Sequence, residues 1–221
     1  VSAILLALVL CLTLLPAAAY ADGGTAVYVS SSGDDGTGDG SADKPYATLA
    51  KAVDAAENGA TVYVMSNLTM KECARFYSKS LTITSNEGGH YTVTRGSSFQ
   101  TQPDDARSWY NPAMVEVQTT GDVGASLTLT NIIFDDDGKK EGTVFAQAVS
   151  DGSVGAASND NLVYVQDAII ASNATVPTTI TLGKGAVLRN FGGMSAVRAT
   201  GAAKLVMESG SVIEDTISGY T

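Results

Sequence analysis

The chain of 221 residues carries 23 acidic and 13 basic residues, a formal net charge of −10, and 44% of its residues are hydrophobic. Because nucleic acids and anionic membranes are bound through clustered lysine and arginine, this charge balance argues against both kinds of partner. It permits cation binding, although an acidic surface is more often a means of staying soluble.

The N-terminal stretch has the pattern of a secretory leader. Residues 3–15 are apolar except for one threonine, Pro16 interrupts the run, and Ala19-Tyr20-Ala21 is the small-x-small pattern that signal peptidase cleaves. The run is too short to cross about 30 Å of hydrocarbon, for which a helix needs about 20 residues. We therefore predict a signal peptide at residues 1–21 and a secreted mature chain that begins at Asp22, with an uncleaved membrane anchor as the alternative.

One cysteine, Cys73, remains after this cleavage, because Cys11 lies in the leader. A single cysteine cannot form an internal disulfide, so the core or a bound metal must hold the secreted chain together. We interpret Cys73 as a small buried residue rather than a nucleophile.

The glycine-rich stretch after the first β-rich run carries three carboxylates, Asp34, Asp35 and Asp39, and is the calcium candidate of the sequence. It departs from the EF-hand pattern, because Tyr46 stands where that pattern needs a bidentate glutamate. A solvated turn is the simpler alternative. The second acidic cluster, Asp135–Asp137, allows the same two interpretations. We expect no obligatory cofactor, and calcium is the one cofactor that the sequence allows.

A helix is predicted after Thr48, which is a suitable N-cap, and before Gly59, which is a suitable C-terminal stop. Apolar residues between them recur with the helical spacing i, i+3, i+4 and i+7, at Leu49, Ala52, Val53 and Ala56.

The rest of the chain consists of short β-rich runs separated by Gly, Asn, Asp and Ser, which is typical of an all-β sandwich, barrel or solenoid. Residues 179–190 recur as residues 204–215, with a period of 25 positions that aligns Gly185 with Gly210. Three strand-like pieces per period, with Gly or Asn at the bends, predict a right-handed parallel β-helix of three strands per coil. A β-sandwich is the structural alternative, although it gives no reason for a fixed repeat.

One coil cannot bury its inward apolar residues alone, and the next coil, about 4.8 Å along the axis, covers them. We expect Ile180 and Leu205 to occupy equivalent places in adjacent coils, and we expect about six to seven coils after residue 60. The helix before the first coil would cover the open end of the stack. The residues expected to be buried are Leu49, Val53, Ile180, Leu182, Val187 and Leu205.

Three segments near the N-terminus resemble the opening of pectate-lyase-like β-helix proteins. They are residues 28–41 (YVSSSGDDGTGDGS), 44–56 (KPYATLAKAVDAA) and 59–64 (GATVYV). Residues 127–131 and 205–215 are similar to coils of large cell-surface β-helix proteins of Gram-positive gut bacteria. The resemblance implies a β-helix but no single activity, because that fold hosts lyases, hydrolases, esterases and adhesins. The domain organisation then reads as signal peptide 1–21, strand, loop and helix 22–59, and coils 60–221 truncated at the C-terminus.

No catalytic set is predicted. The single histidine, His90, stands in a turn without a nucleophile elbow, and Arg189, Arg198 and Glu214 are interpreted as an exterior ladder of stacked charges. Trp109 and Tyr110 are the carbohydrate-platform candidate, with packing of their loop on the helix wall as the simpler alternative.

We therefore predict a non-catalytic stalk or adhesin segment of a bacterial cell-surface protein, attached through a region beyond residue 221. Its expected partners are carbohydrate or a host or cell-wall surface, and further coils of its own full-length chain. The alternative is the N-terminal part of a carbohydrate-active enzyme, a polysaccharide lyase or glycoside hydrolase, whose catalytic coils lie beyond Thr221.

Overall fold

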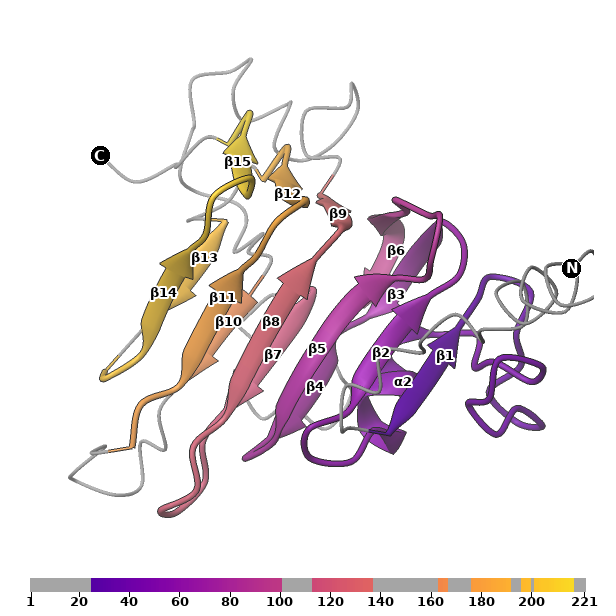
Figure 1. Cartoon of the computed structure of the whole chain (residues 1–221), viewed down its shortest axis with the longest axis horizontal. Helices are drawn as coiled ribbons and strands as arrows, with labels where there is room; N and C mark the ends of the chain where they lie inside the picture. The colour runs from indigo at the N-terminus through magenta and orange to yellow at the C-terminus, as the bar shows by residue number, and fades with distance from the viewer. Residues whose placement is uncertain are drawn as a thin grey trace, which may run out of the picture.

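The computed structural model describes residues 25–100, 113–136, 163–166, 176–191, 196–199 and 201–216. Within these ranges the chain is mostly β, with fifteen strands in three parallel sheets and a single helix, α2 (Figure 1). No helix in these ranges is long and apolar enough to cross a membrane. The predicted signal peptide, residues 1–21, lies outside the described residues.

We name the sheets A, B and C. Sheet A has the order β1 (Ala26–Val29), β2 (Thr61–Val64), β5 (Ser80–Ser85), β8 (Ser126–Thr130), β11 (Thr179–Leu182) and β14 (Lys204–Met207). Sheet B has the order β3 (Leu68–Glu72), β6 (Thr92–Gln100), β9 (Ile132–Asp135), β12 (Ala186–Arg189) and β15 (Val212–Glu214). Sheet C has the order β4 (Ala74–Tyr77), β7 (Val115–Gln118), β10 (Val163–Gln166) and β13 (Val197–Ala199).

The chain visits the three sheets in a fixed rotation. From β2 onward it passes from A to B to C and back to A, and every pairing between neighbouring strands is parallel. We call one passage a circuit. Figure 1 shows the result as strands of sheet A lying side by side from β1 to β14.

The circuits differ in length. Equivalent positions in sheet A are 21, 46, 53 and 25 residues apart, at the pairs Val62/Ile83, Leu81/Leu127, Leu127/Ile180 and Ile180/Leu205. The predicted equivalence of Ile180 and Leu205 is confirmed, but in sheet A the spacing of 25 holds only for the last circuit. Because the middle circuits are longer, sheet A receives five described strands from β2 onward, fewer than the six to seven coils expected.

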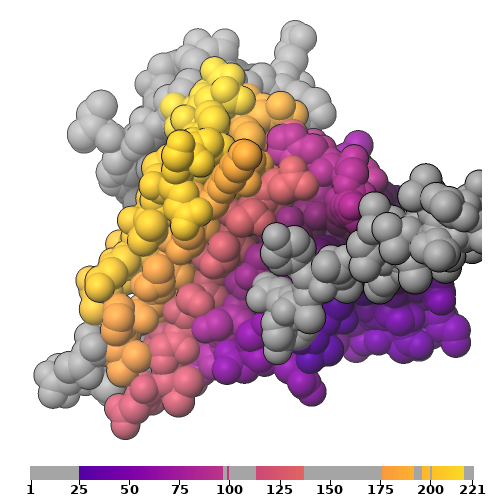
Figure 2. Space-filling view, viewed as in Figure 1, coloured from indigo at the N-terminus to yellow at the C-terminus, as the bar shows by residue number. Residues whose placement is uncertain are grey.

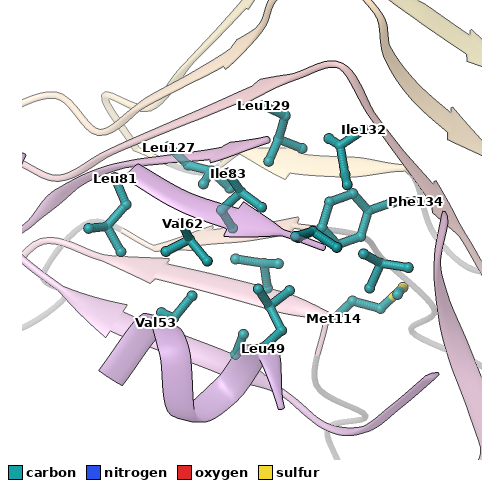
Figure 3. Packing of buried hydrophobic residues seen from close by; sticks show 14 of the residues in the cluster. Leu49, Val53, Val62, Leu81, Ile83, Met114, Leu127, Leu129, Ile132 and Phe134 are labelled. Atoms are coloured by element: carbon teal, nitrogen blue, oxygen red, sulfur yellow. The ribbon is translucent and has the colours of Figure 1, made fainter. Parts of the chain in front are cut away.

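The core lies between the three sheets. Alternate residues of each strand are buried, so that Leu81, Leu127 and Ile180 form one inward row of sheet A and Phe134 and Leu188 lie in an inward row of sheet B. Figure 3 shows side chains from several strands converging on this interior. Burial of each such side chain stabilises the folded state by about 1.5–3 kcal/mol. The cysteine of the described residues, Cys73, is free, so no disulfide adds to this stability there.

Two of the six residues expected to be buried are not. Val187 is half-buried and its neighbours Ala186 and Leu188 are buried instead, because a shift of one residue along a strand moves a side chain to the opposite face. Leu205 lies in the same row as Ile180 but is 41% exposed, since within the described residues β14 is paired only with β11.

The corners between sheets use residues that tolerate a left-handed backbone. Between sheets A and B, φ is +45° at Asn131, +76° at Gly185 and +86° at Gly210. After sheet B, φ is +62° at Asn190 and +52° at Asp215, which are 25 positions apart. Glycine, asparagine and aspartate adopt this conformation at the lowest cost, so the stacked corners explain the repeated Gly, Asn and Asp of the sequence.

The helix α2 (Leu49–Ala55) begins at Thr48, whose Oγ1 accepts a hydrogen bond from the backbone N–H of Lys51 at 3.2 Å, as expected of an N-cap. The helix packs against β1, β3 and β4. Its buried residues Leu49 and Val53 point into the core (Figure 3). At its C-terminal end the Lys79 ammonium donates to three backbone carbonyls, those of Val53, Asp54 and Ala56, at 3.2, 3.0 and 2.8 Å.

Candidate functional site

The carboxylates proposed for calcium are bonded to the loop's own backbone. Asp34 Oδ1 accepts from the N–H groups of Gly36 and Thr37 at 2.7 and 2.8 Å, and these bonds, that to Thr37 first, hold the pKa of Asp34 below its ordinary value. Asp39 Oδ1 accepts from the N–H of Ser41 at 3.0 Å, and the pKa of Asp39 is lowered by the Ser41 hydroxyl and then by this backbone bond.

The carboxylate of Asp35, unlike those of Asp34 and Asp39, accepts hydrogen bonds from residues at the start of α2. Its Oδ1 accepts from the N–H groups of Ala47 and Thr48 at 2.7 and 3.1 Å, and its Oδ2 accepts from the Thr48 hydroxyl at 2.7 Å. The carboxylate therefore ties the loop to the start of α2. In the part of the chain that the structure describes, no group of three or more His, Cys, Asp or Glu side chains could hold a metal ion. Calcium at Asp34, Asp35 and Asp39 stays a prediction.

A buried ion pair lies on sheet C. The side chain of Glu116 is fully buried, accepts from Arg75 Nε at 2.6 Å and accepts from Gln118 Nε2 at 2.6 Å. Burial alone would lower the pKa of the Arg75 guanidinium, but the Glu116 carboxylate raises it above its ordinary value. Because both charges are compensated, the pair is a structural contact that would be costly to break from one side.

Cys73 lies next to this pair and is buried and free of any disulfide. Burial, followed by the charge of Glu116, raises the pKa of the thiol to about 12. Since the thiolate is the nucleophilic form, Cys73 is unsuited to nucleophilic catalysis, as the sequence predicted.

The acidic cluster that begins at Asp135 is used in ion pairs. Arg189 Nε donates to Asp135 Oδ2 at 2.8 Å and the Asn190 side-chain amide donates to Asp135 Oδ1 at 2.9 Å. Arg189 also stands opposite Glu214 in the register of β12 and β15, so the predicted exterior ladder is confirmed there. Asp136 forms an ion pair with Arg95, and Asp137 lies outside the described residues.

The remaining candidates do not gather at one place. His90 Nε2 lies 3.0 Å from the backbone oxygen of Gly185, so this residue bridges two corners. Arg198 is on β13, opposite Tyr164 of β10. Trp109 and Tyr110 lie outside the described residues. The structure thus assembles no catalytic constellation from these residues within its described part.

The outer face of sheet A carries a feature that the sequence reasoning missed. Every outward position of β5, β8 and β11 is serine or threonine, and all eight are half-buried or exposed. We call this set the hydroxyl face: Ser80, Thr82, Thr84, Ser126, Thr128, Thr130, Thr179 and Thr181. The Thr-x-Thr patterns at 82–84, 128–130 and 179–181 were the signal that could have revealed it.

The hydroxyls of this face form a regular array. Thr82, Thr128 and Thr181 are consecutive partners in one row, with a strand spacing of about 4.8 Å and about 6.6 Å between alternate residues of one strand. Of the eight, Thr84 bonds its neighbour's carbonyl, whereas the other seven side chains make no hydrogen bond to any described residue. Figure 2 shows these strands as parallel bands on the face turned to the viewer.

An aromatic pair flanks the hydroxyl face. Tyr28 of β1 and Tyr63 of β2 stack with ring centroids 5.2 Å apart, and Tyr63 is opposite Thr84 in the register of sheet A. Comparison with known proteins finds no matching family model, no matching curated protein and no matching solved structure.

Proposed function

We propose that the chain is a segment of a right-handed parallel β-helix that is exported, cleaved after Ala21, and acts as a non-catalytic stalk of a bacterial cell surface. In this proposal the hydroxyl face contacts neutral polysaccharide. The observation that carries it is the uncharged array of serine and threonine side chains on sheet A, seven of which make no hydrogen bond to a described residue.

The rotation of the chain through three parallel sheets around one core supports the β-helix. A crossover between parallel strands of one sheet is right-handed in about 98% of cases, which supports the handedness. Each circuit lengthens the stack by about 4.8 Å along its axis. A stack of many circuits is therefore suited to a stalk, which holds its far end away from the cell surface.

The contacts of the charged residues support a role without catalysis. The carboxylates of Asp34, Asp35 and Asp39 hold a loop, and Glu116 and Asp135 hold arginines. These groups stabilise the fold, whereas seven of the eight side chains of the hydroxyl face make no hydrogen bond to a described residue.

The chemistry of the hydroxyl face favours a polymer that itself repeats hydroxyl groups. Threonine offers a donor, an acceptor and a methyl group, and a neutral sugar chain offers hydroxyls and apolar ring faces in return. A paired sheet holds its side chains in place, so binding immobilises little of the protein. Each contact is weak, and many contacts in one plane add up.

The test is to incubate the chain from Asp22 with insoluble neutral polysaccharides and with soluble polygalacturonate. Bound protein is measured by sedimentation, and products are measured as reducing ends and as unsaturated uronate. We expect binding to a neutral polysaccharide without product. Thr82→Val, Thr128→Val and Thr181→Val together remove three hydroxyls and keep the side-chain shape, and should weaken binding by about tenfold or more.

The matched control is Thr69→Val with Thr94→Val, an equivalent pair on sheet B, which should bind as the unaltered chain does. Product formation would support the enzyme alternative. Absence of binding, or equal binding by the sheet A and sheet B variants, would contradict the proposed role of the hydroxyl face.

A further inference from the structure

The hydroxyl face extends in two directions over sheet A. Its rows across the strands are Ser80, Ser126 and Thr179, then Thr82, Thr128 and Thr181, then Thr84 and Thr130. Across three strands the array spans about 10 Å, and along the strands it spans about 13 Å. It is therefore a patch of hydroxyl groups and not a single line of them.

The rows of this patch are straight. The pairing of β5 with β8 and of β8 with β11 runs without a register shift, whereas the pairing of β3 with β6 in sheet B shifts between Met70 and Glu72. Figure 1 shows β5, β8 and β11 lying side by side. The hydroxyl groups therefore project from one side of a regular sheet at even intervals.

The patch is ordered before any ligand arrives. Each of β5, β8 and β11 is paired with a strand on both sides, which holds the backbone. Six of the eight residues are threonine, whose branched Cβ restricts rotation about χ1, and no member of the set is charged. Binding to this patch therefore costs the protein little conformational freedom.

The borders of the patch differ from its interior. On β2 the next position in the row of Thr84 is Tyr63. On β14 the next positions in the rows of Thr179 and Thr181 are Lys204 and Val206, both exposed. Larger or charged side chains thus limit the hydroxyl face to three strands.

The form of the patch selects the form of the ligand. A single dissolved sugar chain is narrow, so it covers one row, leaves the other hydroxyl groups to water and loses its own conformational freedom on binding. In a solid polysaccharide the chains lie side by side and are already ordered, so many weak contacts form together. Straight rows also require extended chains, because a coiled chain soon turns its hydroxyl groups out of the plane.

We propose that the hydroxyl face binds the flat surface of a solid, extended neutral polysaccharide of the cellulose or chitin type. This inference rests on the proposed function, and it specifies the class of polymer and its physical state.

The first test compares polymers. The chain from Asp22 is sedimented with microcrystalline cellulose, with chitin powder and with starch granules; cellulose and starch are both insoluble polymers of glucose, but the chains of starch are coiled. We expect a dissociation constant at least about tenfold lower for cellulose or chitin than for starch. An excess of soluble cellohexaose or chitohexaose should not release the bound protein, because each soluble chain replaces one row of contacts.

The second test compares two triple variants that each remove three hydroxyl groups. One removes a row across the strands (Thr82→Val, Thr128→Val and Thr181→Val), and the other removes the groups along β8 (Ser126→Ala, Thr128→Val and Thr130→Val). A flat surface contacts all of these positions, so both variants should weaken binding to the solid by a similar factor of about ten. A single chain lying along one direction would lose three contacts in one variant and one in the other.

The matched control is the sheet B variant with Thr69→Val and Thr94→Val, which should bind the solid as the unaltered chain does. Release by the soluble oligosaccharides, equal affinity for starch, or a loss confined to one triple variant would overturn the inference and leave contact with neutral polysaccharide intact. Absence of binding to every neutral polysaccharide would contradict the proposed function as well.

Discussion

The two ends of the stack are built from similar strands but differ in what covers them. At the N-terminal end a loop pairs with β1 and α2 lies against β4. The Lys79 ammonium donates hydrogen bonds to carbonyls at the C-terminal end of α2. At β14 the described residues provide no such cover, and Leu205 is 41% exposed although Ile180, its partner one circuit earlier, is fully buried. In a stacked fold, burial thus depends on the neighbouring circuit as much as on the residue itself.

The largest expected effect on the free energy of unfolding comes from comparing Ile180 and Leu205, which lie in the same inward row of sheet A. Ile180→Ala removes a side chain covered on both sides and should lower the free energy of unfolding by about 2–5 kcal/mol. Leu205→Ala, one circuit later, should lower it by at most about 1 kcal/mol, because much of the side chain is already in water. Urea unfolding at concentrations that keep the chain monomeric measures both values.

Equal losses of stability in the two variants would show that β14 is covered to the same degree as β11. The comparison between the two ends of the stack would then be wrong.

A smaller effect is expected at the closed end. Lys79→Met keeps the aliphatic stem but removes three hydrogen bonds to carbonyls at the C-terminus of α2, and should lower the free energy of unfolding by about 1–2 kcal/mol. Lys71→Met, at an exposed position of β3, is the matched control and should change it by less than about 0.5 kcal/mol. Similar urea midpoints for the two variants would mean that Lys79 does not hold the helix.

The smallest effect concerns the loop that covers β1. The folded state lowers the pKa of Asp34 and Asp39 below their ordinary value of 3.8, so each favours folding above that value, and the contribution is lost as the pH falls through the lowered pKa. Stability measured from pH 7 to about pH 3 should therefore fall less steeply for Asp34→Asn than for the unaltered chain. If the free energy of unfolding changed with pH in the same way for both proteins, the lowered pKa of Asp34 would not contribute to stability.

Much of the local structure could be predicted from the sequence. The spacing of Leu49 and Val53 gave the helix, and the repeat gave the equivalence of Ile180 and Leu205. The prediction for Val187 was wrong because the repeat aligns two segments without telling which face of the strand is inward. The prediction for Leu205 was wrong because its burial requires a neighbour on the far side of β14.

The site was harder to predict, because it arises from register rather than from motifs. Thr82, Thr128 and Thr181 are up to 53 positions apart from one partner to the next, and only strand pairing places them in one row. The carboxylates of Asp34 and Asp39 were predicted as possible calcium ligands. In the structure they accept hydrogen bonds from backbone N–H groups of their own loop, which the sequence pattern does not identify.

Because the circuits differ in length, the chain can gain residues between its strands without gaining strands. Circuits of 21 and of 53 residues both add one strand to sheet A, so the height of the stack follows the number of circuits and not the number of residues. An insertion between β8 and β11 lengthens the chain without shifting Ile180 from its place over Leu127. The closure entropy of a longer connection grows only slowly with its length. The surface between the strands can therefore diversify while the distance spanned by the molecule stays constant.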